Sequence, residues 1–277
     1  MDIRKKTFCL RRFIKRHSGK CLILIVIIII GTYLFYTVRA SQFYQPYLLP
    51  EVHRIAPVPL PGRKYPEKKW LKRMNSLEAA RYAQSQYIGM EIDIVFEEGQ
   101  RFLDVRHPPT ASIGLSLDVL IGEIKNPRHH FYWLDFKNLT DANKQTALDE
   151  LYRIARKYDI VNNIIVESSN ASVLTNFSDR GFYTSYCLPR IEANKMTAEE
   201  LKSHVNNIFN QLDKNPVNYV SANQNQYPLI KKYLIGYDML LWNSTDNPLA
   251  AEIIERKLLK DPHVKIILVE DKSVGYR

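Results

Sequence analysis

The sequence predicts a (β/α)8 barrel, the TIM-barrel fold of the α/β class, preceded by one transmembrane helix. From Trp70 onward, short apolar runs alternate with longer amphipathic stretches. Polar and charged residues recur at the carboxyl ends of these runs, where barrel enzymes carry their active sites. No glycine-rich phosphate fingerprint follows any run, which disfavours a nucleotide-binding open sheet. An open doubly wound sheet is the alternative fold.

The amino-terminal part of the chain predicts its topology. An apolar run from Cys21 to Val38 is long enough for one membrane-spanning helix. Because the tail 1–20 is strongly basic, the positive-inside rule keeps it cytoplasmic and exports everything after the run. A cleavable signal peptide is the competing interpretation, but its apolar region is usually shorter. We therefore expect an uncleaved signal anchor, a proline-rich linker over 39–69 and a barrel domain over 70–277.

Charge and cysteine usage restrict the partners and the compartment. The net charge is +10, but the cytoplasmic tail supplies most of it. The exported part is only mildly basic, so nucleic acid is not an expected partner. Of three cysteines, only Cys187 lies in the exported part, which excludes an internal disulfide there. This pattern favours a single-pass protein of the bacterial inner membrane, with its barrel in the periplasm or outside the cell.

The periodicity predicts eight strands and seven helices after the linker. The expected strands are 70–74, 88–96, 131–137, 163–168, 182–187, 217–223, 237–242 and 264–270. The expected helices are 76–86, 116–125, 141–158, 170–178, 197–213, 225–234 and 248–260. Thr140 is a plausible cap for the third helix, and Thr197 with Glu200 forms a capping-box pattern at the fifth.

Two carboxylates in the second expected strand predict a metal site. Glu91 and Asp93 alternate with aliphatic residues, so both point to one face of the strand. Such a pair is costly in apolar surroundings without positive charge, and oxygen ligands suit Mg²⁺ or Ca²⁺. A short run, 101–105, then leads to His107, which is followed by two prolines. The alternative is a half-exposed edge strand with a solvated acidic face and a loop histidine.

Other strand ends supply further candidates. Asp135 and Lys137 share a face of the third strand and end near the carboxylate pair in a barrel. The remaining candidates for substrate binding are Arg73, Asn75, Glu167 and Trp242.

The first half of the barrel resembles the glycerophosphodiester phosphodiesterase-like superfamily, which includes phosphatidylinositol phospholipase C and sphingomyelinase D. The resemblance rests on four motifs: W-x-K-x-x-N-S from Trp70, E-x-D from Glu91, H-P-P from His107, and WLDFKNL over 133–139. The menorin branch has the more similar pattern, with W-x-H-x-x-N-S in the first strand. The second half of the chain matches only in the order and spacing of its expected strands.

The resemblance implies a role for each matching residue. Glu91, Asp93 and Asp135 correspond to the metal ligands, and His107 to the histidine that protonates the leaving oxygen. Arg73 and Lys137 correspond to positive groups that hold the phosphate. A phosphodiester needs this chemistry, because its oxygens carry charge and its alkoxide leaving group needs a proton.

One departure divides the functional predictions. Lys72 stands where the family has a second catalytic histidine, and lysine is a poor base at neutral pH. The first hypothesis is a membrane-anchored, metal-dependent phosphodiesterase acting on a glycerophosphodiester, a lipid head group or an envelope glycan linked by phosphodiesters. The second is a catalytically impaired barrel that binds such a ligand or a protein partner. A weaker third is a metal-independent polysaccharide hydrolase with Trp242 as a sugar platform.

Overall fold

The computed structural model describes residues 22–35, 37, 49–243 and 248–271. The chain divides into two units, one of residues 1–44 with 245–254 and one of residues 45–244 with 255–277. In the first unit, residues 22–35 form a helix. The site described below lies entirely within the second unit.

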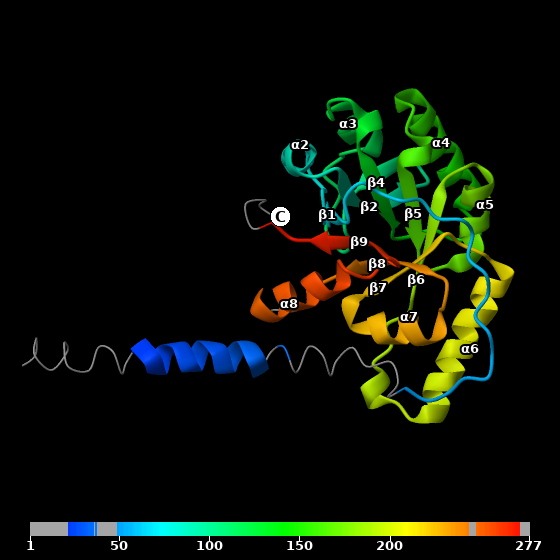
Figure 1. The fold of residues 1–277 in the computed structure, drawn as a ribbon. Helices are drawn as coiled ribbons and strands as arrows, with labels where there is room; N and C mark the ends of the chain where they lie inside the picture. The colour runs from blue at the N-terminus through cyan, green and yellow to red at the C-terminus, as the bar shows by residue number, and fades with distance from the viewer. Residues whose placement is uncertain (1–21, 36, 38–48, 244–247, 272–277) are drawn as a thin grey trace, which may run out of the picture. The chain divides into compact units, whose positions relative to one another are not determined.

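Eight parallel strands close into a barrel, as the sequence predicts (Figure 1). They are β1 (Lys69–Leu71), β2 (Gly89–Glu97), β4 (Phe131–Phe136), β5 (Ile164–Ser168), β6 (Tyr183–Cys187), β7 (Tyr219–Asn223), β8 (Asp238–Trp242) and β9 (Val264–Val269). The first strand pairs with both β9 and β2, where Leu71 lies opposite Met90. This pairing closes the sheet and excludes the open doubly wound alternative.

A ninth strand, β3 (Phe102–Val105), lies outside the parallel barrel and runs antiparallel to β2. It corresponds to the short run predicted over 101–105. Its last residue, Val105, pairs with Ile94, so the chain that follows returns to the level of Asp93. This hairpin brings His107 back toward the carboxylates of β2.

Helices follow most strands, and α2 to α7 pack around the barrel (Figure 1). They are α2 (Leu77–Gln86), α3 (Leu117–Gly122), α4 (Lys144–Tyr158), α5 (Leu174–Asp179), α6 (Ala198–Lys214), α7 (Tyr227–Tyr233) and α8 (Pro248–Leu258). The predicted capping box at α6 is confirmed, with Thr197 and Glu200 bonded reciprocally. The cap predicted for α4 is wrong. Thr140 precedes a turn over 141–143, where its N–H donates to the Asn143 side chain (2.8 Å), and the helix begins only after Asn143.

The amino-terminal end of the barrel is filled by aromatic side chains. Trp70 is fully buried and stacks on Phe131, with ring centroids 5.9 Å apart. Tyr65 packs edge-on against both rings. Gly89 faces the indole of Trp70 so closely that a β-carbon there would overlap it. The absence of a side chain at Gly89 therefore lets the bulkiest residue of β1 fill this end of the barrel.

Residues 49–68, part of the predicted linker, contact the barrel. Leu60 donates its N–H to the carbonyl of Val217 (2.9 Å), and Arg63 donates its N–H to the hydroxyl of Tyr219 (2.6 Å). The side chain of Lys232 donates to the carbonyl of Leu49 (2.5 Å). These contacts place the segment on the barrel's amino-terminal end. Residues 39–48 of the predicted linker lie outside the described part of the chain.

Within the described residues, no helix is both long and apolar enough to cross a membrane. The predicted transmembrane segment, 21–38, is described only over 22–35 and at 37, and it is not confirmed. The basic tail 1–20 lies outside the described residues.

Candidate metal and phosphate site

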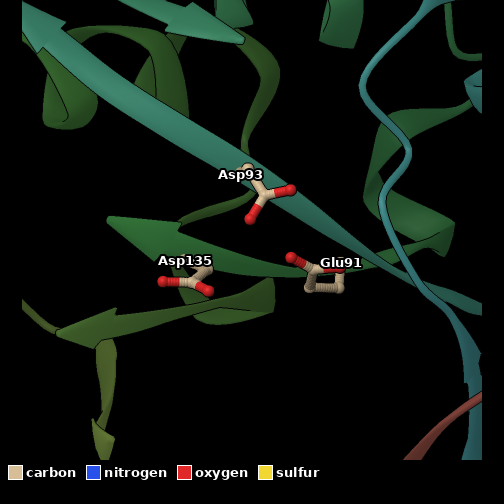
Figure 2. Close-up of side chains that lie close together, drawn as sticks. All are labelled: Glu91, Asp93 and Asp135. Atoms are coloured by element: carbon tan, nitrogen blue, oxygen red, sulfur yellow. The ribbon is translucent and has the colours of Figure 1, made fainter. Parts of the chain in front are cut away.

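Three carboxylates meet at the carboxyl end of the barrel. Glu91 and Asp93 come from β2, and Asp135 comes from the neighbouring β4, where it pairs directly with Asp93. One oxygen from each lies within 4.8 Å of an oxygen from each of the others. Figure 2 shows the three side chains around a common space. The convergence predicted from their strand positions is confirmed.

The backbone after β1 fixes the orientation of Glu91. Strand β1 ends at Leu71, earlier than the predicted 74. Arg73 then adopts a left-handed conformation, with φ of 59°, which is uncommon for a residue other than glycine. In this conformation its N–H donates to Oε2 of Glu91 at 2.6 Å. Strained backbone of this kind concentrates at functional sites, and here it orients a buried carboxylate.

The side chain of Asn75 holds Asp93 in the same way. Its amide Nδ2 donates to Oδ2 of Asp93 (2.7 Å), and its Oδ1 accepts the backbone N–H of Asp93 (3.0 Å). Asn75 therefore lies behind the carboxylate, where it orients Asp93. The sequence predicts it as a substrate-binding residue, and its contact with Asp93 instead resembles the outer contacts that orient metal ligands.

Lys137 neutralises part of the acidic cluster. Its ammonium lies 2.7 Å from Oδ1 of Asp93 and also forms an ion pair with Asp135. These two carboxylates raise the pKa of Lys137 against the opposing effect of its partial burial. The lysine is therefore a fixed positive charge beside the carboxylates.

Burial and mutual repulsion raise the pKa values of two carboxyl groups of the site, those of Glu91 and Asp135. Burial raises the pKa of Glu91 well above its ordinary value, and the charges of Asp93 and Asp135 raise it further. Burial also raises the pKa of Asp135, although the charge of Lys137 opposes the shift. Such perturbed carboxyl groups in a cleft are typical of functional sites.

The donor set fits a hard divalent cation. Three carboxylates offer only oxygen ligands, which Mg²⁺ and Ca²⁺ prefer. Oxygens on opposite sides of an ion, with bonds of about 2.3–2.6 Å as for Ca²⁺, lie roughly 4.6–5.2 Å apart. The separation of up to 4.8 Å between the carboxylate oxygens is compatible with that span. Each oxygen retains lone pairs beyond those used by Arg73, Asn75 and Lys137.

His107 lies at the edge of this site, on the chain that leaves β3. The preceding residue, Arg106, donates its backbone N–H to the carbonyl of Asp93 (3.1 Å). Its guanidinium bonds the fully buried Asp104 through Nε (2.5 Å) and Glu97 through the terminal nitrogen (2.6 Å). These contacts fasten the His107 backbone to β2. The sequence analysis missed Arg106, whose position beside His107 was the only available signal.

Lys72 and Arg73 bring positive charge to the other side of the site. Lys72 is largely buried, and its ammonium lies 3.4 Å from a carboxylate oxygen of the more exposed Glu270. The side chain of Arg73 is exposed. Glu270 follows β9 and Lys72 follows β1, so only closure of the barrel reveals their proximity.

One pocket of about 340 Å³ brings nearly all the predicted site residues together. Its lining contains Lys72, Arg73, Glu91, Asp93, His107, Asp135, Lys137, Glu167 and Trp242. Asn75 is the only predicted site residue that does not line it. The pocket also includes Trp133, Phe136, Ser169, Cys187 and Leu268, which the sequence analysis missed. Trp133 could have been inferred, because it lies two residues before Asp135 and shares its face of β4.

Glu167 lies deep on the β5 side of the pocket and is almost completely buried. It pairs with Asp135 across the sheet. Burial raises the pKa of Glu167 well above its ordinary value and the charge of Asp135 adds to the shift, while the adjacent side chains of Ser221 and Trp133 oppose it. Burial therefore favours the uncharged form of the Glu167 carboxyl group.

The fold is that of glycerophosphodiester phosphodiesterases. The crystal structure of such an enzyme from Parabacteroides distasonis matches with a TM-score of 0.51 and 14% identity, covering 75% of this chain and 93% of that chain. A protein from Galdieria sulphuraria assigned to the same activity matches with a TM-score of 0.51 and 15% identity, covering 76% and 94% of the two chains. No protein-family profile and no curated protein sequence matches the chain.

Proposed function

We propose that this protein is a metal-dependent phosphodiesterase acting on a glycerophosphodiester, a lipid head group or an envelope phosphodiester. The observation that carries the proposal is the convergence of Glu91, Asp93 and Asp135 in one pocket with Lys137 and His107. The shared fold supports it, since the enzyme from P. distasonis is a glycerophosphodiester phosphodiesterase. The more specific likeness to the menorin branch rests on the sequence motifs alone.

Each part of the site has a role in this chemistry. Glu91, Asp93 and Asp135 would hold the cation, which when bound neutralises charge on the phosphate and polarises it. Lys137 is already fixed beside this position and would stabilise a non-bridging oxygen. His107 lines the same pocket and would donate a proton to the leaving alcohol.

Lys72 supports a second candidate function, a barrel that binds a phosphodiester without cleaving it. Lysine is ordinarily a cation at neutral pH, so it has no free lone pair to accept a proton. Its contact with Glu270 is an ion pair of the kind that suits a charged, phosphate-binding role. A reaction that needs two proton-transferring groups would then have only His107.

Metal binding tests the shared part of both functions. Calorimetry of the purified chain with Ca²⁺, Mg²⁺ or Mn²⁺ should show binding that Asp93→Ala abolishes. Asp141→Ala, which removes an exposed carboxylate in the turn before α4, is the matched control and should leave the binding intact. Equal binding by wild type and Asp93→Ala would refute the proposed metal site.

Turnover then separates the enzyme from the binder. Hydrolysis of a panel of alkyl and nitrophenyl phosphodiesters should require the cation and be lost with a chelator. If wild type is inert on the panel and Lys72→His gains activity, the natural protein is a binder. Hydrolysis that is indifferent to chelator would contradict the metal-dependent mechanism.

We further propose that the amino-terminal segment anchors the barrel to the bacterial inner membrane and that the barrel is exported. The support is the basic tail that precedes the apolar run. In the described helix over 22–35, apolar side chains from Leu22 to Phe35 are 45–63% exposed, and such a surface calls for an apolar environment. A carboxyl-terminal reporter that works only after export should be active, whereas activity of a cytoplasm-only reporter would refute the orientation.

A further inference from the structure

The turn that carries His107, residues 107–110, has few hydrogen bonds of its own. The N–H of Thr110 donates to the carbonyl of His107 (3.0 Å). Pro108 and Pro109, which lie between them, have no N–H to donate. Within the described part of the chain, no group hydrogen-bonds the His107 imidazole. The position of the imidazole therefore depends on how the backbone of the turn is held.

The side chain of Arg106 connects this turn to two carboxylates. Its guanidinium donates through Nη1 to the carbonyl of Thr110 (3.3 Å). It also donates through Nε to Asp104 and through Nη2 to Glu97. Of the residues 107–114, Thr110 is the only one that hydrogen-bonds a described residue outside this stretch. One side chain therefore holds the turn against β2 and β3.

The carboxylate partners of Arg106 belong to the rigid part of the fold. Asp104 is fully buried in β3 and lies opposite Val95 of β2, and Glu97 is the last residue of β2. A guanidinium is planar and presents its donors in fixed directions, so three acceptors around it determine its orientation. The Thr110 carbonyl is thereby held relative to the strand that carries the metal-site carboxylates.

A proton donor needs this accuracy more than a charged phosphate-binding group does. The donor has to lie within hydrogen-bond reach of the leaving oxygen, about 2.6–3.2 Å, and a misplacement of about 1 Å can cost about 10²-fold in rate. Glu91 and Asp93 are placed by a barrel strand, whereas His107 lies on a turn outside the barrel. Its position needs a fixing contact of its own.

We propose that Arg106 is a positioning residue for His107. By tying Thr110 to Asp104 and Glu97, it holds the imidazole where it can protonate the leaving oxygen. Arg106 is not among the residues that line the pocket, so it acts through His107 and not on the ligand. This inference rests on the proposed function, because a barrel that only binds its ligand needs no proton donor.

The test uses Arg106→Lys in the full chain with Ca²⁺. Lysine keeps a positive charge beside the buried Asp104, but a single ammonium cannot reproduce the fork that reaches three acceptors. Hydrolysis of an alkyl phosphodiester should fall roughly 10–100-fold, and hydrolysis of a nitrophenyl ester by less than about threefold, because its leaving group scarcely needs a proton. In a His107→Ala background, Arg106→Lys should change the alkyl rate by less than about twofold, since the group that it positions is absent.

Two further variants complete the comparison. Arg153→Lys is the matched control, since that arginine bridges Asp118 and Glu150 away from the pocket, and it should leave both rates unchanged. Glu97→Gln removes only the more exposed carboxylate partner of Arg106. It should lower the alkyl rate selectively, by a smaller factor than Arg106→Lys, and it serves as the test if Arg106→Lys does not fold.

Hydrogen exchange measures the turn without turnover. The Thr110 amide should exchange about tenfold faster in Arg106→Lys than in wild type, and at the wild-type rate in Arg153→Lys. Unchanged exchange would overturn the proposal, because the turn would then be held without Arg106. Equal losses on both substrates, or a full additional loss in the His107→Ala background, would overturn it in favour of a general structural role. If wild type hydrolyses neither substrate, the proposed function fails and the positioning role falls with it.

Discussion

Replacing Lys137 with methionine should destabilise the metal-free protein and make it unusually responsive to Ca²⁺. The ammonium of Lys137 lies 2.7 Å from Asp93, whose side chain is 2% exposed, while its own side chain is 21% exposed. Removing one partner of a buried ion pair costs about 3–5 kcal/mol, because the other charge is left uncompensated. Partial exposure of the lysine places the expected loss near the lower end, about 3 kcal/mol. In a protein of this size that corresponds to roughly 6–12 °C in Tm.

The assay is denaturant unfolding of wild type and Lys137→Met, each with a chelator and with Ca²⁺. The cation should recover much of the loss, since a ligand at 100 times its Kd adds about 2.7 kcal/mol to the unfolding free energy. It should stabilise the variant more than wild type, because the ammonium no longer repels it. Lys144→Met is the control, since that lysine pairs with the 70% exposed Asp141 and its loss should cost at most about 1 kcal/mol. A loss in Lys137→Met no larger than in this control would refute the reasoning.

Three further predictions follow from the same geometry. If the protein is a phosphodiesterase, His107→Ala should lower the rate on alkyl diesters by a factor of about 10²–10⁴. The rate on nitrophenyl esters should fall much less, because their leaving group scarcely needs a proton. Equal losses on both substrates would show that His107 is not the acid. Because Glu91 and Asp135 have raised pKa values in the folded state, the folded protein binds more protons than the unfolded chain above about pH 4. The unfolding free energy in chelator should therefore fall as pH rises from 4 to 8, and Ca²⁺ should flatten that slope by favouring the ionised carboxylates; a flat or rising curve in chelator would contradict this. Gly89→Ala should destabilise the fold by about 1–3 kcal/mol through overlap with the Trp70 indole, measured by chemical unfolding, and a neutral result would show that the indole can move aside.

The strands and helices of the barrel were largely predictable because each obeys a local rule. Strand β4 reads as one apolar run, and its observed span of Phe131–Phe136 differs from the predicted 131–137 by one residue. The start of α4 was misplaced because Thr140 and Asn143 can both cap a helix, and tertiary contacts rather than propensity decide between them. The sequence contains no equivalent signal for the contact of Arg63 with Tyr219, which fixes the preceding segment to the barrel.

The candidate site was predictable in its residues but not in its internal contacts. Strand alternation and the common end of parallel strands were enough to bring Glu91, Asp93 and Asp135 together. The left-handed backbone of Arg73 could not be inferred, because nothing in its local sequence requires it. The pairing of Lys72 with Glu270 links residues at opposite ends of the barrel sequence, so it depends on closure of the sheet.

The acidic cluster carries a stability cost that the fold itself does not require. Glu91, Asp93 and Glu167 are each no more than 3% exposed, and apolar side chains of similar volume in place of buried charges often leave a protein equally or more stable. Two hydrogen bonds reduce the cost: the Arg73 N–H donates to Glu91, and the Asn75 amide donates to Asp93. The first of them requires the uncommon left-handed backbone of Arg73. Contacts of this kind orient carboxylates toward a shared point, which a purely structural core has no reason to do. The cluster is thus better explained by ligand binding than by folding, and this holds whether Lys72 leaves the site able to cleave its ligand or only to bind it.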